Sequence, residues 1–273
     1  MTKSGTVHRD TFRRGSRTYY NSTRFFPRRV RDDVFILYGF VRVADDYVDR
    51  IPQDRVGFEQ FVTRYRRALR GDTTGDPIVD SFVELARRRS FDPDWTDAFL
   101  QSMRMDLEKS VHATLPETLE YVYGSAEVIG LFMARLLELD RAAEEAACML
   151  GRAMQFINFI RDIREDNELG RIYLPISETS LPDLTIESAR RDPQEFERFL
   201  RAQLQRYREW QDKAEKGYAM IPRRYRIPIK TAGDMYNWTG RVIARNPYIV
   251  FQRKVKPAHP RIITAGLINA VFC

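Results

Sequence analysis

The sequence contains few of the features that mark secreted, disulfide-linked or membrane-spanning proteins. It has only two cysteines, Cys148 and Cys273, which form neither a disulfide framework nor a zinc-binding spacing. Its first twenty residues lack the apolar core that a secretory signal needs. The most apolar stretch, VIGLFMARLLEL, is too short to span a bilayer and contains Arg135. We therefore expect a cytoplasmic protein that does not cross a membrane.

Long alternating runs of β-branched residues, internal repeats and low-complexity linkers are also absent. Apolar residues instead recur at spacings of three and four, which indicates amphipathic helices. Turn-forming stretches such as GDTTGDP and MIPRRYRIP separate these segments. The sequence predicts one all-α domain over residues 1–273. The expected helices cover residues 29–48, 54–70, 77–89, 93–109, 116–138, 141–166, 187–218, 224–245 and 258–270.

The balance of charge is basic, with 45 Lys and Arg against 38 Asp and Glu in 273 residues. Such an excess suits nucleic acid, an anionic membrane surface or an anionic small substrate, and it also suits a plain solvated surface. The runs YRRALR and PRRYR are the features that would favour a phosphate-binding helical module. Both runs lie outside the acidic motifs described next, so we interpret them mostly as solvated faces and expect no nucleic-acid partner.

The segment RDDVFILYGFVRVADDYVD places several like charges within an apolar helical pattern. Side chains separated by four, three and four residues fall in one stripe on a helix. This stripe consists of Tyr38, Arg42, Asp45 and Asp49, and Asp46 lies beside it. Neighbouring carboxylates repel one another, so the helix must gain something from whatever these carboxylates bind.

A second stripe of polar residues lies in QFINFIRDIREDNELGRIYLP, residues 155–175. It consists of Gln155, Asn158, Asp162 and Asp166, and large apolar residues fill the other sides of the same helix. A helix that is apolar around most of its circumference is buried. We therefore expect this stripe to face an internal cavity rather than bulk water.

Burying several carboxylates without cations is very costly, and two explanations remain. In the first, the carboxylates form ordinary ion pairs with Arg42, Arg161, Arg164 and Arg171. In the second, the two stripes face each other and hold divalent cations. Hard oxygen ligands suit Mg²⁺, which binds few protein carboxylates and shares substrate phosphates. Either stripe alone favours ion pairs, whereas the two together favour a metal site at which arginines clamp a diphosphate.

These two segments resemble the signature segments of the squalene/phytoene synthase family. The resemblance continues, in order along the chain, in GSRTYYNSTRFFP, MRMDLEKS, YVYGSAEVIGLFMARLL and YNWTGRVI. It extends from about residue 12 to about residue 256. A lone DDxxD motif is weak, but its pairing with RDxxEDxxxGRxYLP is specific.

The resemblance implies an all-α isoprenoid-synthase fold with a central cavity, and head-to-head (1′-1) condensation of two allylic prenyl diphosphates. It implies Mg²⁺, for which Mn²⁺ could substitute, bound by Asp45, Asp49, Asp162 and Asp166 with support from Asp46, Asn158 and Glu165. Twelve residues would bind the substrate: Ser16, Arg17, Thr18, Tyr38, Arg42, Gln155, Asn158, Arg161, Arg171, Tyr173, Tyr236 and Arg253.

The family tyrosine near the carbocation corresponds to Tyr121, or to Tyr123 if the register is shifted. It would steer proton loss or stabilise the cation. Glu127 stands where the family more commonly has glycine, which alters the expected cavity wall. An allylic cation must be kept from water. The candidate apolar wall residues are Phe132, Met133, Leu136, Phe156, Ile157 and Phe159, although plain core packing is the favoured interpretation for each one taken singly.

The compact length and the segments GSRTYYNSTRFFP and GSAEVIGL are more similar to the phytoene branch of the family. This resemblance implies that two geranylgeranyl diphosphates give phytoene via prephytoene diphosphate without NADPH. Squalene or dehydrosqualene synthesis from farnesyl diphosphate is the alternative, and NADPH is expected only for squalene. A class I terpene cyclase and an inactive helper of a partner synthase fit the motifs less well. Because the substrates and products carry long hydrocarbon chains, we expect peripheral attachment to the inner face of the cell membrane.

Overall fold

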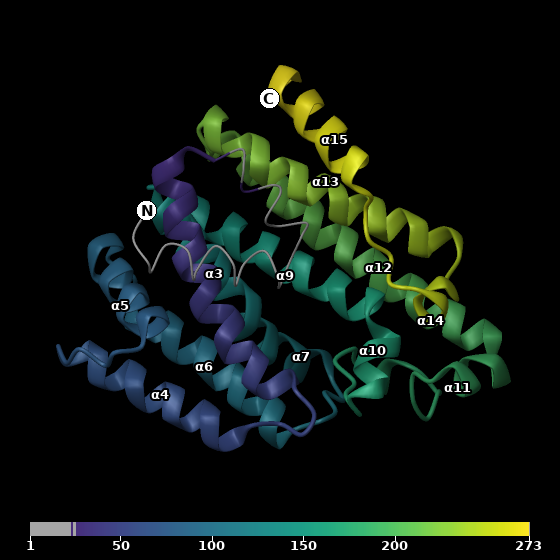
Figure 1. The fold of residues 1–273 in the computed structure, drawn as a ribbon. Coiled ribbons are helices and arrows are strands. Elements are labelled where there is room, and N and C mark those ends of the chain that lie inside the picture. Colours follow the sequence, from purple (N-terminus) through teal and green to yellow (C-terminus); the bar gives the residue numbers. More distant parts are fainter. Residues whose placement is uncertain (1–22, 24–25, 273) are drawn as a thin grey trace.

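The computed structural model describes Thr23 and residues 26–272, and these residues are almost entirely helical (Figure 1). Within them no strand forms, and Val111 and Ile172 make one isolated β-bridge. The predicted all-α fold is therefore confirmed. The α-helices are α3 (Arg28–Asp49), α4 (Arg55–Leu69), α5 (Pro77–Arg89), α6 (Pro93–Glu108), α7 (Leu115–Val122), α8 (Val128–Leu136), α9 (Glu144–Arg161), α10 (Ile163–Glu168), α11 (Ile186–Arg191), α12 (Pro193–Glu215), α13 (Arg223–Arg245), α14 (Ile249–Gln252) and α15 (His259–Phe272).

Several helices begin at an aspartate followed directly by proline. Asp76, Asp92 and Asp192 each accept a hydrogen bond from a backbone N–H in the first turn of α5, α6 and α12. The proline that follows has no N–H to leave unpaired, and its fixed φ suits the first helical position. These local signals explain why the sequence places the starts of α5 and α6 correctly.

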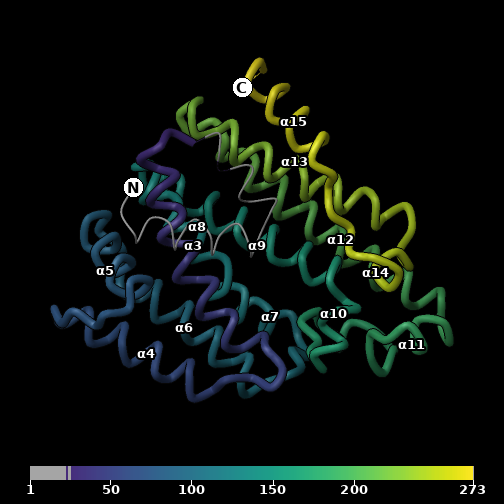
Figure 2. The backbone as a smooth tube through the Cα atoms, in the orientation of Figure 1, coloured from purple at the N-terminus to yellow at the C-terminus, as the bar shows by residue number. Residues whose placement is uncertain are grey.

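Helix α9 lies at the centre of the bundle and packs against α8, α12 and α13, while α3 packs against α4, α5 and α6 (Figure 2). An aromatic cluster fixes α3 in place. The ring of Phe40 on α3 stacks on Phe82 with centroids 3.8 Å apart and also contacts Phe61 and Phe99. Aromatic pairs of this kind contribute about 0.5–1.5 kcal/mol each beyond their buried area. The acidic stripe of α3 is thus held on a rigid support.

Three long helices predicted from the sequence are interrupted in the structure. The helix expected at 141–166 breaks at Asp162, which separates α9 from α10 and has φ −101° and ψ 14°. Helix α10 then packs against α14. The helix expected at 187–218 divides at Asp192 into α11 and α12. Hydrophobic periodicity continues across both breaks and obscures them, although the Asp-Pro pair at Asp192 is the same start signal that begins α5 and α6.

The third interruption is the π-helical turn η1 (Tyr123–Glu127), which joins α7 to α8. Gly124 lies in this turn against the backbone of α6. A Cβ atom at Gly124 would come within 2.1 Å of the Ala98 carbonyl oxygen, so this close approach requires glycine. Single π-turns within helices are frequent at functional sites, and here the turn directs Ser125 to the cavity described next.

Candidate active site

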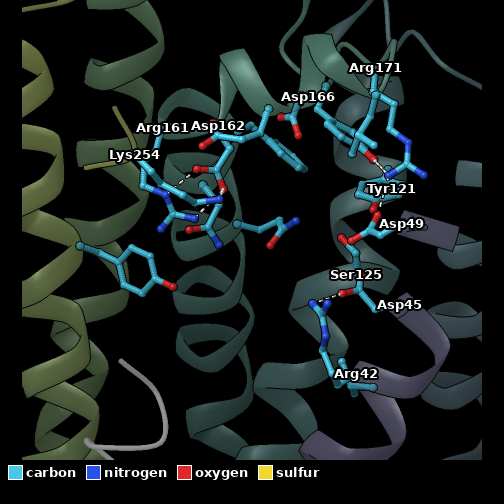
Figure 3. A pocket seen from close by; sticks show the side chains of 18 of the residues that line it. Arg42, Asp45, Asp49, Tyr121, Ser125, Arg161, Asp162, Asp166, Arg171 and Lys254 are labelled. Carbon is cyan, nitrogen blue, oxygen red and sulfur yellow. Dashed lines mark hydrogen bonds and ion pairs between the residues drawn. The ribbon is translucent and has the colours of Figure 1, made fainter. Parts of the chain in front are cut away.

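A cavity of about 630 Å³ lies between α3, α6, α9, α10 and α13. Both polar stripes predicted from the sequence line it, and Figure 3 shows their side chains on opposite walls. The predicted site residues on the wall are Tyr38, Arg42, Asp45, Asp49, Tyr121, Gln155, Asn158, Arg161, Asp162, Glu165, Asp166, Arg171, Tyr173 and Tyr236.

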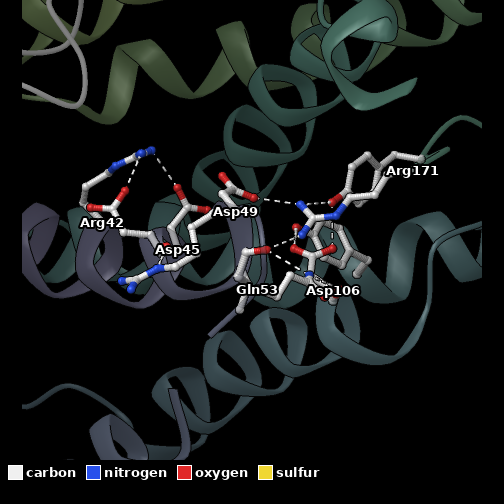
Figure 4. Close-up of polar contacts among 11 residues, drawn as sticks. Arg42, Asp45, Asp49, Gln53, Asp106 and Arg171 are labelled. Atoms are coloured by element: carbon white, nitrogen blue, oxygen red, sulfur yellow. Dashed lines mark hydrogen bonds and ion pairs between the residues drawn. The ribbon is translucent and has the colours of Figure 1, made fainter. Parts of the chain in front are cut away.

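The α3 wall carries Asp45 and Asp49 one helical turn apart. Arg42 Nη1 donates to Asp45 Oδ2 at 2.8 Å, and the Arg42 guanidinium also pairs with Asp46 (Figure 4). Enclosure in the cavity and the neighbouring Asp49 nevertheless raise the pKa of Asp45 to about 8, because Arg42 offsets these effects only in part. The Asp45 carboxyl therefore retains a proton near neutral pH unless further positive charge approaches.

The opposite wall is formed by the end of α9 and by α10. Arg161 donates two hydrogen bonds to Asp162, at 2.7 and 2.6 Å, and Lys254 Nζ lies 2.8 Å from Asp162 Oδ2. Burial acts to raise the pKa of Asp162, but these two cations outweigh it and lower the pKa. Asp166 forms no ion pair within the described part of the chain, and burial followed by repulsion from Asp162 raises its pKa well above the usual range.

Arg171 connects the α3 wall to a buried aromatic network. Its Nη1 donates to Asp49 Oδ1 at 2.7 Å and to the Tyr173 hydroxyl oxygen at 3.2 Å. The hydroxyls of Tyr121 and Tyr173 each donate to Asp106 at 2.7 Å. Burial raises the pKa of Asp106 to about 6, although Arg171 and the two tyrosines lower it. The network therefore holds Tyr121 at the cavity wall in one fixed orientation.

Asp106 was not predicted as a site residue. It lies in the segment MRMDLEKS, and the signal that could have identified it is its spacing on α6. Phe99 and Met103 line the cavity, and Asp106 continues their row at intervals of four and three residues. A single acid in such an apolar row must be paired or functional. Further wall residues that were missed are Val41, Ser125, Met235, Thr239, Lys254 and Lys256.

Some predicted site residues lie away from the cavity wall. Arg253 is exposed and is not among the lining residues, whereas the adjacent Lys254 is. Asp46 faces Arg42 on the outer side of the stripe. Tyr123 is 44% exposed and does not line the cavity, so Tyr121 is the tyrosine in position. Ser16, Arg17 and Thr18 lie outside the described residues.

Glu127, which stands at the position where glycine is more common, is buried and does not line the cavity. Arg152 Nε donates to its Oε1 at 2.7 Å, so the carboxylate is paired between the π-helical turn η1 and helix α9. The effect of Glu127 on the cavity is therefore indirect, through the packing of these helices.

Of the six candidate apolar wall residues only one lines the cavity, and the other five pack in or against the core, as favoured for each residue taken singly. Phe159 lines the cavity, but Phe132, Leu136, Phe156 and Ile157 are buried in the core, and Met133 packs against that core. Phe156 packs against Trp210 of α12, and Ile157 lies beside Gly240 of α13. Periodicity identifies a buried face but does not say whether a neighbouring helix or a cavity covers it.

The donor set on the two walls fits Mg²⁺ that is shared with a substrate. Within residues 26–272 no three His, Cys, Asp or Glu side chains converge as a metal cluster. The buried Asn158 Oδ1 and Glu165 Oε2 nevertheless have no hydrogen-bond partner, and such acceptors are costly to leave unpaired. Oxygen ligands on separate walls suit an ion that completes its shell with phosphate oxygens and water.

Comparison with known proteins identifies the family to which this arrangement belongs. Residues 12–261 match the sequence profile described as "Squalene/phytoene synthase". The chain is a member of the squalene/phytoene synthase family. Members are prenyltransferases that join two prenyl diphosphates head to head, and membership implies a diphosphate substrate bound with Mg²⁺. The family and the enzyme class predicted from the sequence are thus confirmed.

Similar curated proteins carry the names of phytoene synthases. The chain is 30% identical to a 15-cis-phytoene synthase of Pantoea ananas, over 85% of this chain and 79% of that protein. It is 29% identical to a phytoene synthase of Rhodobacter capsulatus, over 89% of this chain and 74% of that protein. These identities show the family and leave the product open.

Solved structures share the fold of this synthase-family chain. A dehydrosqualene synthase in complex with ligand superposes with a TM-score of 0.86 and 21% identity, covering 99% of this chain and 96% of that one. Squalene synthase HpnC from Alicyclobacillus acidocaldarius gives a TM-score of 0.81 and 22% identity, covering 90% and 94%. Among the described helices, none combines the length and apolarity that crossing a membrane requires.

Proposed function

We propose that this family member condenses two molecules of geranylgeranyl diphosphate to phytoene through prephytoene diphosphate. The curated relatives named as phytoene synthases support the C20 substrate. A second candidate is the condensation of farnesyl diphosphate to dehydrosqualene or squalene. The high TM-scores to a dehydrosqualene synthase and a squalene synthase favour this alternative.

The observation that carries the proposal is the pair of facing acidic walls with arginines on both sides. Asp45 and Asp49 would hold Mg²⁺ on one wall, and Asp162 and Asp166 on the other. When bound, Mg²⁺ supplies charge neutralisation of the leaving diphosphate. The raised pKa values of Asp45 and Asp166 support this assignment, because a cation between the walls would favour their charged forms.

The cationic side chains would then exchange partners when substrate binds. Arg42, Arg161 and Arg171 are each paired with an aspartate of the walls. A diphosphate offers the same geometry of oxygen acceptors, and arginine binds phosphate bidentately. Lys254 and Lys256 add charge at the rim of the cavity. The substrate would thus release aspartates for metal binding and take over the arginines.

Apolar and aromatic side chains beneath the acidic walls would protect the carbocation from water. Val41, Phe99, Met103 and Met235 line this part of the cavity. The ring of Phe159 stacks on Tyr173 with centroids 4.5 Å apart, and aromatic faces stabilise a passing cation. Tyr121 donates its hydroxyl hydrogen to Asp106, which leaves its oxygen lone pairs available to a cation. As part of the proposal, the reaction would end by loss of a proton and would need no hydride from NADPH.

A product assay tests the proposal directly. The purified chain is incubated with Mg²⁺ and either geranylgeranyl or farnesyl diphosphate, each with and without NADPH, and hydrocarbons are identified by mass. We expect a C40 product that does not depend on NADPH. A C30 product would replace the proposal with the alternative, and NADPH dependence would distinguish squalene from dehydrosqualene. Absence of any condensation with Mg²⁺ present would contradict both.

A further inference from the structure

Helix α15 has the reverse of the usual amphipathic pattern. The buried side, which packs on α13, consists of one large apolar residue, Ile262, together with Gly266 and Asn269. Asn269 Nδ2 donates to Thr231 Oγ1 at 3.2 Å and to Asp234 Oδ2 at 2.8 Å. A helix that packs on its neighbour through an amide and a glycine buries few of its large apolar side chains in the core.

The large apolar side chains of α15 point away from the protein instead. Leu267 is 61% exposed, Val271 68% and Phe272 82%, and Ile263 and Ile268 are each about half exposed. From Ile262 to Phe272 the helix contains no charged residue. Figure 1 shows α15 lying along the outer side of α13, and none of the other described helices covers its far side in this view. Contiguous exposed apolar surface of this kind marks a site of interaction.

Basic residues lie at both ends of this apolar face, within a strongly basic stretch of the chain. Residues 222–273 contain ten Lys and Arg and a single acid, Asp234, so they hold more than the whole excess of positive charge in the chain. Arg223 is exposed at the end of α15, where its Nη2 donates to the Ala270 carbonyl oxygen at 3.1 Å, and Arg224 is exposed beside it. Arg261 is exposed at the start of α15. Both ends of the apolar face are thus basic.

We propose that α15 is a lipid-docking helix that lies in the surface of an anionic membrane. Apolar side chains flanked by arginines match the boundary between acyl chains and acidic headgroups. The fourteen residues of α15 are too few to span a bilayer, which fits a helix lying in the surface plane. A second copy of the chain is a poorer occupant, because face-to-face packing would bring two basic rims together.

The docking helix follows directly on part of the cavity rim. Lys254, Lys256 and Pro257 line the cavity, and α15 begins at His259. The start of α15 therefore lies close to the rim of the cavity. This position suits the entry and exit of molecules with long hydrocarbon chains, although docking itself does not depend on which substrate is used.

Vesicle sedimentation tests this proposal without any assay of activity. The full chain is mixed with vesicles of phosphatidylcholine alone or with phosphatidylglycerol, at low and high salt, and the bound fraction is measured. We expect binding to the anionic vesicles that weakens with salt. The L267S/V271S variant should lower the partition coefficient at least about tenfold, since two exposed apolar anchors are lost. The matched control V56S/L69S, with exposed apolar residues on α4, should bind like wild type.

A second variant changes the charge beside α15 and leaves its apolar side chains in place. R223Q/R224Q should weaken binding to anionic vesicles and flatten the salt dependence, whereas R66Q/R70Q on the α4 side should not. Circular dichroism should show wild-type helix content in all variants. Wild-type protein that binds neither vesicle type, or equal binding by L267S/V271S, would overturn the proposal. So would a wild-type dimer in the absence of lipid that L267S/V271S converts to a monomer, since another copy would then cover the face.

Discussion

Arg171 and Asp49 lie 122 positions apart in the sequence and are joined by a 2.7 Å hydrogen bond from Nη1 to Oδ1. The same guanidinium also donates to the backbone carbonyl of Val48 and to the Tyr173 hydroxyl. One buried arginine thus connects the acidic end of α3 to the aromatic network that holds Tyr121. Because the charge of Asp49 is already matched, a metal ion that binds Asp49 must share it with Arg171 or displace that contact.

Replacing one aspartate on each wall tests the metal assignment. Asp45→Asn and Asp162→Asn should each reduce kcat/KM at least about a hundredfold, because an amide is a weaker ligand and carries no charge. Steady-state kinetics with Mg²⁺ measures the loss, and circular dichroism should show an unchanged fold. Asp72→Asn, in the loop after α4, is the matched control. Most of the activity surviving in both variants would refute the assignment.

The raised pKa of Asp45 should make the folding stability of the metal-free protein depend on pH. Unfolded, the carboxyl loses its proton near the ordinary value of 3.8, but folded it keeps the proton up to about pH 8. Between these values unfolding releases a proton, so rising pH favours unfolding. We expect the unfolding temperature to fall by roughly 5 °C from pH 5 to pH 8. Asp45→Asn should flatten this decline. Mg²⁺ with inorganic pyrophosphate should restore the unfolding temperature of the wild-type protein at pH 8. A decline that Asp45→Asn leaves unchanged would assign it to other groups.

Removing the hydroxyl of Tyr121 should separate the two halves of the reaction. Tyr121→Phe keeps the ring beside Phe159 but loses the hydrogen bond to Asp106. We expect a slow second step with accumulation of the cyclopropylcarbinyl diphosphate, which quenched-flow mass analysis would detect. Tyr123→Phe, on the exposed side of the π-turn, should behave like wild type. Identical time courses for Tyr121→Phe and wild type would transfer the role to another residue.

The ion pair between Glu127 and Arg152 should contribute to stability rather than to chemistry. Glu127→Ala leaves a charged guanidinium without its carboxylate in a largely buried position, and we expect a loss of about 3 kcal/mol in the free energy of unfolding. Urea denaturation measures this loss. Adding Arg152→Met should recover part of it, since the unpaired charge is then removed. A fully additive double variant would mean that the two residues are not coupled.

The sequence predicts the site better than it predicts the cavity. Spacings of three and four residues place Asp45 with Asp49 and Asp162 with Asp166 correctly on shared faces, because helical geometry alone decides this. The break at Asp162 could not be predicted in this way, because no proline or glycine lies near it in the sequence. Phe132 and Phe159 look alike in a periodic pattern, yet one is core and the other is cavity wall. That difference depends on long-range packing, which local sequence does not encode.

The interruption at Asp162 makes α10 a short helix of six residues that follows directly on α9. It carries Glu165 and Asp166 at the cavity, and Arg164 Nη1 donates to the Gln252 carbonyl oxygen of α14 at 3.2 Å. Helix α10 contacts α14, and the segment that contains Lys254 connects α14 to α15, so α10 is physically connected to α15. Thermodynamic linkage makes any coupling between the cavity and α15 reciprocal. If an occupied cavity changes the affinity of α15 for its binding surface by some factor, binding of that surface changes the affinity of the cavity for its ligand by the same factor.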